Sequence, residues 1–397
     1  MNSRIGQVKV SLLWQSPQAR HCDRRFFDRI NFWRDYFPGD LGEQLNVAEV
    51  DQVVSYQAEA GELVEPYDAH QVHRIKRSQF QTRVSPGLVI MPQRGRFYPR
   101  NLVNGISSYF EGDRRPLRCL QVDDDELLID LNHPLARYSL KLEARLLKEL
   151  EAKQEHGGVS IDIPQMCTQN GPGMQARLPD TDTDFYSSDP FARSDNRADS
   201  AFYSMSRLVP HIDSTASQQI ARIYERYLQP GMQVLDMMSS WQSHLPDSLG
   251  DLAVTGLGLN QQELQHNPRL TTQAIHDLNA DTRLPFKDKQ FDAVICSVSV
   301  EYLIKPLEIF AEVARVLKPG SSFVVTFSER WFPTKVITLW QEMHAFERMG
   351  FVLDIFDKSQ AFTNLGTESV RGLPRPANDK YAAELAESDP VYAVWGT

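Results

Sequence analysis

The sequence DLNADTRLPFKDKQFDAVICS occupies residues 277–297, and RVLKPG follows at residues 315–320. The apolar run at 291–296 is short and comes after turn residues, which is typical of a buried strand. The apolar residues of 306–317 recur every three or four positions, which predicts a helix that stops at the turn residues 318–320. A strand followed by a helix of this length indicates a unit of a parallel sheet.

Further strands and helices are predicted on both sides of this stretch. Short buried runs at 234–236, 252–259 and 323–327 are predicted strands, and a helix is expected to begin near Asp213-Ser214. Strands that alternate with helices predict a doubly wound, Rossmann-like α/β domain over residues 201–397. Ligands of such sheets bind beyond the carboxyl ends of the strands, at the topological switch point.

The C-terminal half resembles the class I S-adenosylmethionine-dependent methyltransferases, most closely the type 11 branch that acts on small molecules. The resemblance extends over about residues 202–397. It implies a methyltransferase domain that uses S-adenosyl-L-methionine as its cofactor. The motifs that carry it are Asp277-Leu278-Asn279, Leu284-Pro285-Phe286, Phe291-Asp292-Ala293-Val294 and Arg315-Val316-Leu317-Lys318-Pro319-Gly320.

The resemblance also implies where the cofactor contacts lie. It places Asp236 beside the methionine end of the cofactor, Asn260 at the ribose, and Ser297 next to the transferred methyl group. Asp277 and Leu278 are expected to face the adenine. The complete set of predicted cofactor-binding residues is Tyr203, Arg207, Asp236, Met237, Ser239, Ser240, Asn260, Gln261, Asp277, Leu278, Asn279 and Ser297.

Two features depart from the family pattern. The loop after the first predicted strand, residues 237–240, has no glycine, although glycine lets the backbone approach a ligand closely. Asn260 stands where the family has a carboxylate that binds the ribose. An amide accepts one hydrogen bond and donates another, but without the strength of a charge. The expectation is a modified, working pocket, and the alternative is a degenerate fold that has lost its cofactor.

A general base is needed only if the acceptor loses a proton during attack. His244, in the loop after the first strand, and Tyr302, after the strand at 291–296, are predicted as catalytic residues. A structural role for His244 remains open. Glu301 is a further candidate, for which a solvated helix start is the favoured interpretation.

Some charged residues have two interpretations. Arg207 precedes the helix at 213–214, where it would meet the cofactor carboxylate or form an interdomain salt bridge. Arg330, Trp331 and Lys335 follow the strand at 323–327, where they would form an acceptor-side wall or a basic helix start.

The N-terminal region, residues 1–150, is predicted to be a β-rich domain with some helix near 26–36. Asp130-Leu131-Asn132-His133-Pro134-Leu135-Ala136, followed by the alternating strand at 140–147, resembles FKBP-like prolyl isomerases of the SlyD type. The resemblance implies an FKBP-like (α+β) domain that recognises a substrate or partner. Residues 151–200 are rich in Gly, Pro and Asp but also contain aromatic residues, which predicts an ordered linker or strap.

Composition and charge argue against some classes of partner. The chain has 397 residues, of which 41% are hydrophobic, and a formal net charge of -10. Its negative charge repels phosphate backbones, so no nucleic-acid partner is expected. No apolar run approaches the ~20 residues of a membrane helix, and the first residues lack a signal-peptide core, so no membrane partner is expected.

The cysteine and histidine spacing gives no metal or disulfide signature. His70 and His73 are three residues apart without a third ligand, so no metal site is predicted. Unpaired thiols favour a reducing, cytoplasmic location. The four cysteines, far apart in the sequence, are Cys22, Cys119, Cys167 and Cys296.

The predicted function is methyl transfer from S-adenosyl-L-methionine to a small-molecule acceptor, with an FKBP-like accessory domain. The N-terminal domain is expected to offer a surface for a protein partner or a homodimer. The alternative is a non-catalytic chaperone or adaptor, or a prolyl-isomerase-like protein, with a degenerate methyltransferase fold. A methyltransferase that acts on a peptide delivered by the N-terminal domain is the third hypothesis.

Overall fold

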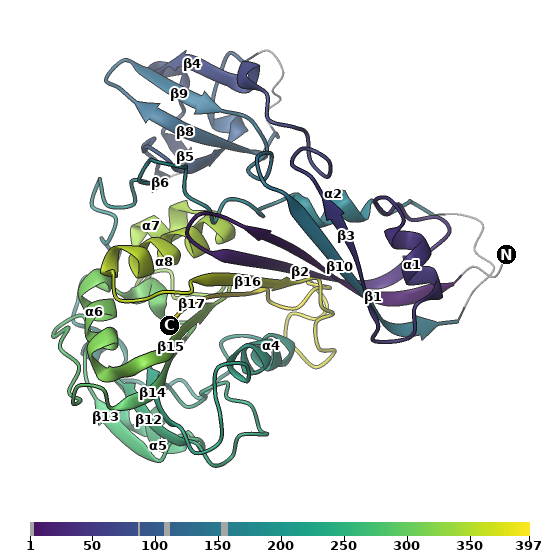
Figure 1. Ribbon diagram of the computed structural model, residues 1–397. Coiled ribbons are helices and arrows are strands. Elements are labelled where there is room, and N and C mark those ends of the chain that lie inside the picture. Colours follow the sequence, from purple (N-terminus) through teal and green to yellow (C-terminus); the bar gives the residue numbers. More distant parts are fainter. Residues whose placement is uncertain (1–3, 86–87, 107–111, 152–157) are drawn as a thin grey trace. The chain divides into compact units, whose positions relative to one another are not determined.

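The computed structural model describes residues 4–85, 88–106, 112–151 and 158–397 (Figure 1). The chain divides into two compact units. The first unit comprises residues 1–190 and 342–351, and the second comprises residues 191–341 and 352–397. None of the helices in the described ranges is long and apolar enough to cross a membrane.

The second unit is built on a mostly parallel sheet in which β17 is antiparallel to both of its neighbours. The strands that were predicted from the apolar runs at 234–236, 252–259, 291–296 and 323–327 are all present. In sheet order the strands are β13 (Thr272–Ile275), β12 (Ala253–Gly258), β11 (Gln233–Met237), β14 (Phe291–Ser297), β15 (Leu317–Phe327), β17 (Val391–Gly396) and β16 (Gly366–Arg371).

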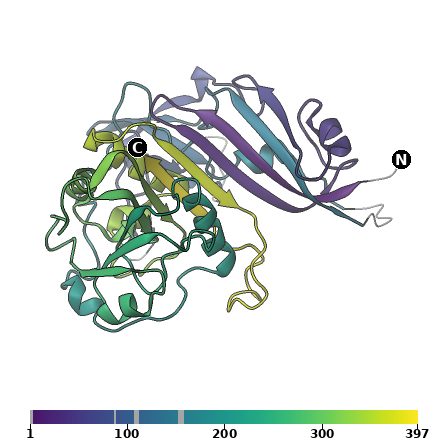
Figure 2. The ribbon, with the colours of Figure 1, turned by 60° about the horizontal axis from the view of Figure 1, so that its bottom comes forward.

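Helices of the second unit cover both faces of this sheet (Figures 1 and 2). On one face, Ile220 and Ile223 of α4 pack in a core with Val234 of β11. On the other face, Phe310 of α6 contacts Phe323 of β15, with ring centroids 4.9 Å apart. The helices are α3 (Asp199–Phe202), α4 (Ser214–Tyr224), α5 (Gln261–His266), η4 (Val300–Tyr302), α6 (Pro306–Val316), α7 (Thr338–Glu342) and α8 (Ala345–Ser359). The boundary between the units falls within α8.

Local sequence explains where these helices begin and end. Asp213 caps α4 by accepting a hydrogen bond from the Ala216 N–H, as the predicted start at Asp213-Ser214 requires. Pro306 stands at the first turn of α6, where its missing N–H costs nothing. The end of α6 was predicted correctly, but strand β15 follows it directly. Gly320 (φ +77°) therefore lies in the irregular first part of β15 and not in a turn outside the strand.

The first unit contains a curved antiparallel sheet and two smaller sheets. Buried Leu140, Leu142, Ala144 and Leu146 alternate along β10, which confirms the predicted period of two. The large sheet has the order β2 (Arg20–Asn31), β1 (Ile5–Gln15), β10 (Leu140–Leu150) and β3 (Val53–Ala58). The others are β4 (Val72–Lys76), β9 (Glu126–Asp130), β8 (Pro116–Val122) and β7 (Phe97–Pro99), and the pair β5 (Arg83–Ser85) and β6 (Leu88–Val89). Helices are α1 (Leu41–Val47) and α2 (Ile163–Thr168), with short η1 (Ala69–Gln71), η2 (Arg77–Gln79) and η3 (Arg100–Leu102).

The helix predicted near residues 26–36 is wrong. Strand β2 continues to Asn31 and is followed by a turn, because pairing along the whole of β1 supplies backbone hydrogen bonds that outweigh local preference. The predicted β-rich character of the region is confirmed. Its FKBP-like identity stays a prediction, as do the predicted domain boundaries. Within the predicted strap, α2 and Phe185 are packed in the first unit, where the Phe185 ring lies 5.4 Å from that of Phe351.

Candidate functional site

A cavity of about 410 Å³ lies at the carboxyl ends of β11, β12 and β14 in the second unit. The chain leaves β11 toward β12 on one side, whereas β14 lies on the other, so this is the topological switch point. The volume is in the range of small-molecule and cofactor sites, roughly 300–1,000 Å³. Every predicted site residue except Met237 and Gln261 lines it: Tyr203, Arg207, Asp236, Ser239, Ser240, His244, Asn260, Asp277, Leu278, Asn279, Ser297 and Tyr302.

The pleat of the strand separates Asp236 from Met237. Successive side chains of a strand point to opposite faces, so Asp236 faces the cavity while Met237 is fully buried in the sheet. Gln261 is the first residue of α5 and is exposed. The sequence motif alone does not distinguish these neighbours.

The Asp236 carboxylate forms the buried floor of the site. Its Oδ2 accepts a hydrogen bond from the Ser239 hydroxyl at 2.6 Å. Burial raises the pKa of Asp236 from 3.8 to about 6, although hydrogen bonds from Ser239 and Ser243 oppose the shift. A buried carboxylate of this kind favours a cationic ligand, because a nearby positive charge stabilises its ionised form.

The glycine-free loop after β11 keeps a glycine-like backbone. Met238 has φ +59°, in the left-handed region that costs an L-residue roughly 1–2 kcal/mol. The space for this loop comes from the next strand: a Cβ on Gly258 would lie 2.3 Å from the Ser239 carbonyl oxygen. The Ser239 N–H donates to the Leu257 carbonyl at 2.7 Å. The loop can therefore approach β12 closely because Gly258 has no side chain, and it needs no glycine of its own for this contact.

Asn260 ties the segment before α4 to the cavity. Its Oδ1 accepts from the Glu263 N–H and so caps α5, while its Nδ2 donates to the Tyr203 carbonyl at 2.8 Å. Glu263 is buried, and its carboxylate accepts from the Arg207 N–H and from the Ser240 hydroxyl, both at 2.7 Å. These contacts hold residues 203–207 against the ends of β11 and β12.

The guanidinium of Arg207 is engaged within its own segment. It donates to the carbonyls of Phe202 and Met205 and lies 4.5 Å from the centre of the Phe202 ring. No carboxylate of the second unit's described residues forms an ion pair with it, and the predicted interdomain salt bridge stays a prediction.

Asp277 and Asn279, which follow β13, form different hydrogen bonds in the wall of the cavity. Asp277 accepts from the Asn279 N–H through Oδ1. The Asn279 side chain donates to Asp199 at 2.8 Å and to the Tyr302 carbonyl at 2.9 Å, and it accepts from the Ile304 N–H. Both polar atoms of the Asn279 side chain therefore form hydrogen bonds that stabilise this wall.

Asp199 and Lys335 fix the start of residues 199–211, a segment that lines the cavity and that we call the covering segment. Asp199 lines the cavity and accepts from Arg193 at 2.9 Å and from Lys335 at 3.0 Å. Lys335 is fully buried and also donates to the Arg197 carbonyl at 2.7 Å. Lys335 is thus neither part of an acceptor wall nor of an exposed basic helix start. Arg330 and Trp331, in contrast, do line the cavity.

Burial keeps both predicted catalytic residues neutral at neutral pH. Burial lowers the pKa of His244 to about 4, so its imidazole is neutral at neutral pH, and Nδ1 contacts the Ser217 hydroxyl at 2.8 Å. Burial raises the pKa of Tyr302 well above its ordinary value, and its hydroxyl accepts from the Phe332 N–H at 2.9 Å. His244 is therefore the better proton acceptor of the two. Glu301 is buried, which corrects the expected solvated helix start.

Ser297 is held by a chain of hydroxyls. Its Oγ lies 2.6 Å from the Tyr224 hydroxyl, which in turn lies 2.9 Å from Thr326 Oγ1. Tyr224 comes from α4 and is fully buried. The end of β14 is thus fixed against α4.

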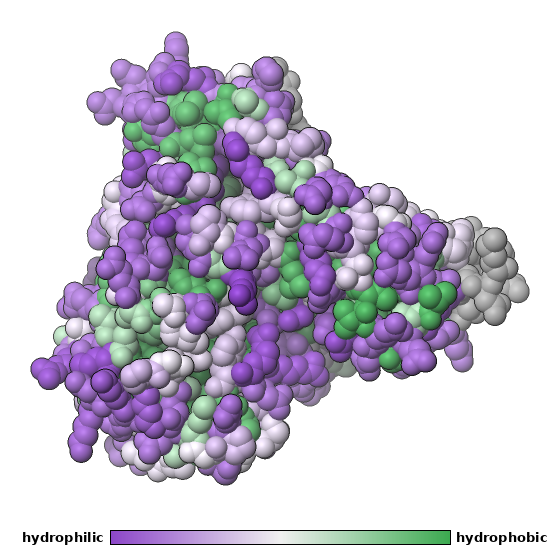
Figure 3. Space-filling view, viewed as in Figure 1, coloured by the Kyte–Doolittle hydropathy of each residue, from purple (hydrophilic) through white to green (hydrophobic). Residues whose placement is uncertain are grey.

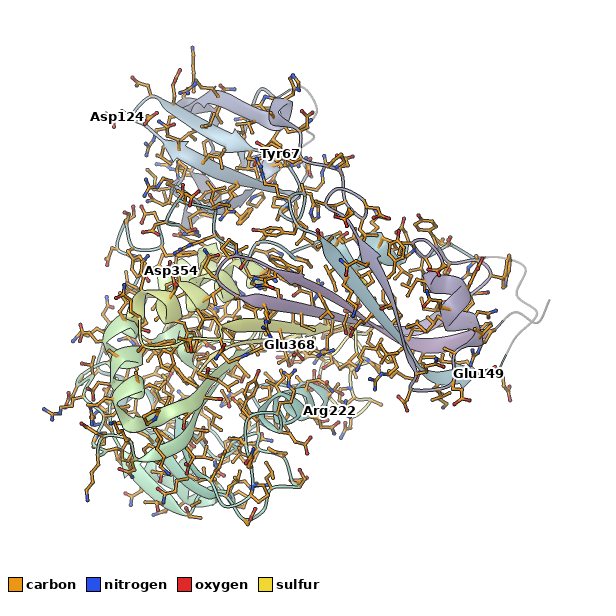
Figure 4. The ribbon with its side chains drawn as sticks, in the orientation of Figure 1. Tyr67, Asp124, Glu149, Arg222, Asp354 and Glu368 are labelled. Atoms are coloured by element: carbon orange, nitrogen blue, oxygen red, sulfur yellow. The ribbon has the colours of Figure 1, made fainter. Side chains whose placement is uncertain are left out.

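Sequence reasoning missed several residues of the lining, among them Asp199, Glu263, Lys380 and Tyr381. Glu263 stands three residues after Asn260, a spacing that predicts a helix start but not burial. Lys380 and Tyr381 lie in the connection between β16 and β17, residues 372–390, which has no periodic pattern. Before this connection, Glu368 of β16, labelled in Figure 4, accepts from Arg226, which follows α4, at 2.7 Å.

Comparison with known proteins defines the class of the central segment. Residues 240–325, from the loop after β11 into β15, match the family model described as a methyltransferase domain. The matched segment includes the loop, β12, β14 and α6, and therefore most of the elements that surround the cavity.

Individual relatives are methyltransferases. The chain is 33% identical over 106 residues to sterol methyltransferase-like 1 of Botryococcus braunii, covering 25% of this chain and 27% of that protein. It is 25% identical over 145 residues to 24-methylenesterol C-methyltransferase 3 of Arabidopsis thaliana, and this match covers 32% of this chain and 38% of that protein. The chain thus spans about a quarter to two fifths of the length of these relatives. Among solved structures, the YcgJ protein of Bacillus subtilis aligns at 13% identity over 45% of this chain and 96% of that one, with a TM-score of 0.33.

Proposed function

We propose that the protein is an S-adenosyl-L-methionine-dependent methyltransferase that acts on a small-molecule acceptor. The observation that carries the proposal is the cavity at the switch point of the second unit, lined by residues from the loops after β11, β12, β13 and β14. The match of residues 240–325 to a methyltransferase domain supports the same reaction class.

The donor and acceptor groups of the cavity fit this cofactor. A ligand with a sulfonium, an amine and two ribose hydroxyls needs carboxylates and hydroxyls around it, and the cavity presents Asp236, Glu263 and Asp277 together with several serines. Asp236 and Ser239 would hold the cationic methionine end. The ribose would lie at Asn260, and Asp277 and Leu278 would face the adenine.

S-adenosyl-L-methionine supplies a methyl group that is already activated by its sulfonium. The residues of the chain therefore have to orient the acceptor and exclude water rather than supply a strong acid or base. Residues of the segment at 199–211 line the cavity, and the rings of Tyr203 and Tyr302 lie near that of Phe332, where they would help to exclude water from the reacting groups. The neutral imidazole of His244 would receive the proton of an acceptor that has to lose one.

The small-molecule acceptor is supported by the names of several relatives, which include sterol and squalene methyltransferases. The test is incubation of the protein with methyl-tritiated cofactor, together with separated small-molecule and protein fractions of a cell extract. Label in the small-molecule fraction is the expected result. Label confined to precipitable protein would contradict the small-molecule acceptor, and the Asp236→Ala variant serves as the control for uncatalysed transfer.

We propose that the first unit is an FKBP-like scaffold that binds a protein partner or a second copy of the chain. Support comes from β3, which is the last strand of its sheet, and from exposed Val47 (81%) and Val53 (45%) near α1 and β3. Figure 3 shows hydrophobic side chains over this region. Light scattering of Val47→Glu against the unchanged protein tests self-association, which the substitution should weaken. A cytoplasmic location is proposed on the free thiols of Cys22, Cys119, Cys167 and Cys296.

A further inference from the structure

The part of the cavity wall that comes from the end of the chain differs in chemistry from the strand ends. Arg330, Trp331 and Phe332 follow β15, and Lys380 and Tyr381 lie between β16 and β17. All five line the cavity. None of them takes part in the cofactor contacts proposed above. These five residues, which we call the acceptor wall, combine aromatic rings with two cationic side chains.

Within the acceptor wall, Phe332 is held by contacts with two other residues of the cavity lining. The Phe332 ring lies 5.4 Å from the His211 ring and 6.0 Å from the Tyr302 ring, and its N–H donates to the Tyr302 hydroxyl. Tyr302 is itself buried. A rigid aromatic surface of this kind binds a flat, conjugated ring by stacking or edge contact.

An ion network holds the cationic part in place. Asp389 accepts from Arg330 at 3.1 Å and from Arg375 at 2.7 Å, and its own N–H donates to Asp213, the cap of α4, at 2.6 Å. Arg375 is buried together with Asp213 and Asp389. The connection between β16 and β17 is therefore anchored on both sides of Lys380 and Tyr381.

The two cations differ in how far they are neutralised. Arg330 shares Asp389 and lies 4.3 Å from the centre of the Tyr381 ring. Lys380 lies 4.8 Å from the centre of the same ring, is exposed, and has no ion-pair partner among the described residues. Two carboxylates of the cavity are already engaged elsewhere: Asp199 by Arg193 and Lys335, and Glu263 by Arg207 and Ser240. Lys380 thus offers an uncompensated positive charge beside an aromatic ring.

We propose that the methyl acceptor is a small aromatic acid, whose ring lies on Trp331 and Tyr381 and whose acidic group binds Lys380 beside Arg330. This inference rests on the proposed methyltransferase function and names its substrate class. A carboxylate gains a charge-assisted hydrogen bond at Lys380, and the aromatic faces select planar rings over flexible chains.

The test measures binding to the whole protein by calorimetry in the presence of saturating S-adenosylhomocysteine, whose own titration comes first. The probes are 3,4-dihydroxybenzoate and indole-3-acetate, each with its neutral amide, and octanoate as an acid without a ring. Both aromatic acids are expected to bind about tenfold more tightly than their amides and than octanoate. Equal affinity for an acid and its amide, tighter binding of octanoate, or no binding of either aromatic acid would overturn the proposal.

Variants assign the preference to the acceptor wall. Lys380→Gln should weaken binding of the acids about tenfold and leave the amides unchanged, and Trp331→Leu should weaken acids and amides alike. Lys289→Gln, at an exposed lysine outside the cavity, is the matched control and should change nothing. An unchanged acid preference in Lys380→Gln would contradict the inference. Failure of S-adenosylhomocysteine to bind would instead contradict the proposed function, while a Lys380-dependent acid site would stand without it.

Discussion

At the scale of single residues, Asp236 couples the cavity to pH. Burial raises its pKa in the folded state from 3.8 to about 6. Below pH 4 the carboxyl is protonated in the folded and unfolded states alike, so it has no effect on stability. Between pH 4 and 6 the unfolded chain ionises first, and the folded state is destabilised by a total of about 3 kcal/mol, which persists above pH 6.

Asp236→Asn should therefore stabilise the ligand-free protein above pH 6 by up to about 3 kcal/mol, with no gain below pH 4. The measurement is the free energy of unfolding in urea as a function of pH. The same substitution should weaken binding of the cationic cofactor, because the neutral amide no longer attracts its charge. Asp251→Asn, at an exposed position, is the control. A stability difference that does not vary with pH would contradict the assignment.

Met238 carries the left-handed turn that replaces the glycine-rich loop. Met238→Gly should relieve the backbone strain, and after the entropy cost of glycine the protein should gain about 0.5–1 kcal/mol. Met238→Val should lose about 2 kcal/mol or more, since a β-branched side chain tolerates this conformation poorly. Thermal unfolding of the two variants in parallel checks the order. Equal stability of glycine and valine at this position would mean that the turn is not left-handed in solution.

At the scale of elements, Asn260 joins α5 to the covering segment through different atoms. Asn260→Asp keeps the helix cap, because a carboxylate oxygen still accepts from the Glu263 N–H, but it removes the donor to the Tyr203 carbonyl. Hydrogen exchange of residues 203–211 should accelerate about five- to tenfold, as expected for one lost hydrogen bond of ~1 kcal/mol, while α5 stays protected. Asn260→Ala should accelerate exchange in both elements. Unchanged exchange at 203–211 in Asn260→Asp would show that the segment is held by other contacts.

The elements also show what could be predicted from the sequence. Strands and helices with a regular apolar period, such as β10 and α6, were predicted because their period reflects one buried face. Strand β2 was missed because its structure depends on pairing with β1 and its sequence is rich in charged residues. Residues at strand ends were predicted to meet and do line one cavity. Lys380 reaches it from the connection between β16 and β17, which has no regular apolar period. Glu263 follows Asn260 in α5, but its burial is a result of packing that this spacing does not encode.

At the scale of the whole molecule, the first unit depends on a segment far along the chain. Glu347 lies in residues 342–351, which belong to the first unit, and it accepts from Arg96 at 2.7 Å and from the Phe97 N–H at 2.8 Å. Both charged side chains are buried. A chain that ends before residue 342 would therefore leave the charge of Arg96 buried without its partner.

Glu347→Gln should lower the free energy of unfolding by about 3–5 kcal/mol, because it leaves an uncompensated buried guanidinium. Calorimetric unfolding is the measurement, with Glu59→Gln at an exposed position as the control. Affinity for S-adenosylhomocysteine should stay within a factor of two, since every residue that lines the cavity belongs to the second unit. A stability loss below 1 kcal/mol would contradict a buried ion pair at this place.

The most direct test of the central claim is calorimetric titration of the full chain with S-adenosyl-L-methionine and with S-adenosylhomocysteine at pH 7.5. The cavity at the ends of β11, β12 and β14 predicts saturable one-to-one binding of both, weakened in Asp236→Asn more for the cationic cofactor than for the neutral product. Absence of heat and of thermal stabilisation at millimolar ligand would contradict a working methyltransferase and would leave the binding surfaces of the first unit as the basis of function.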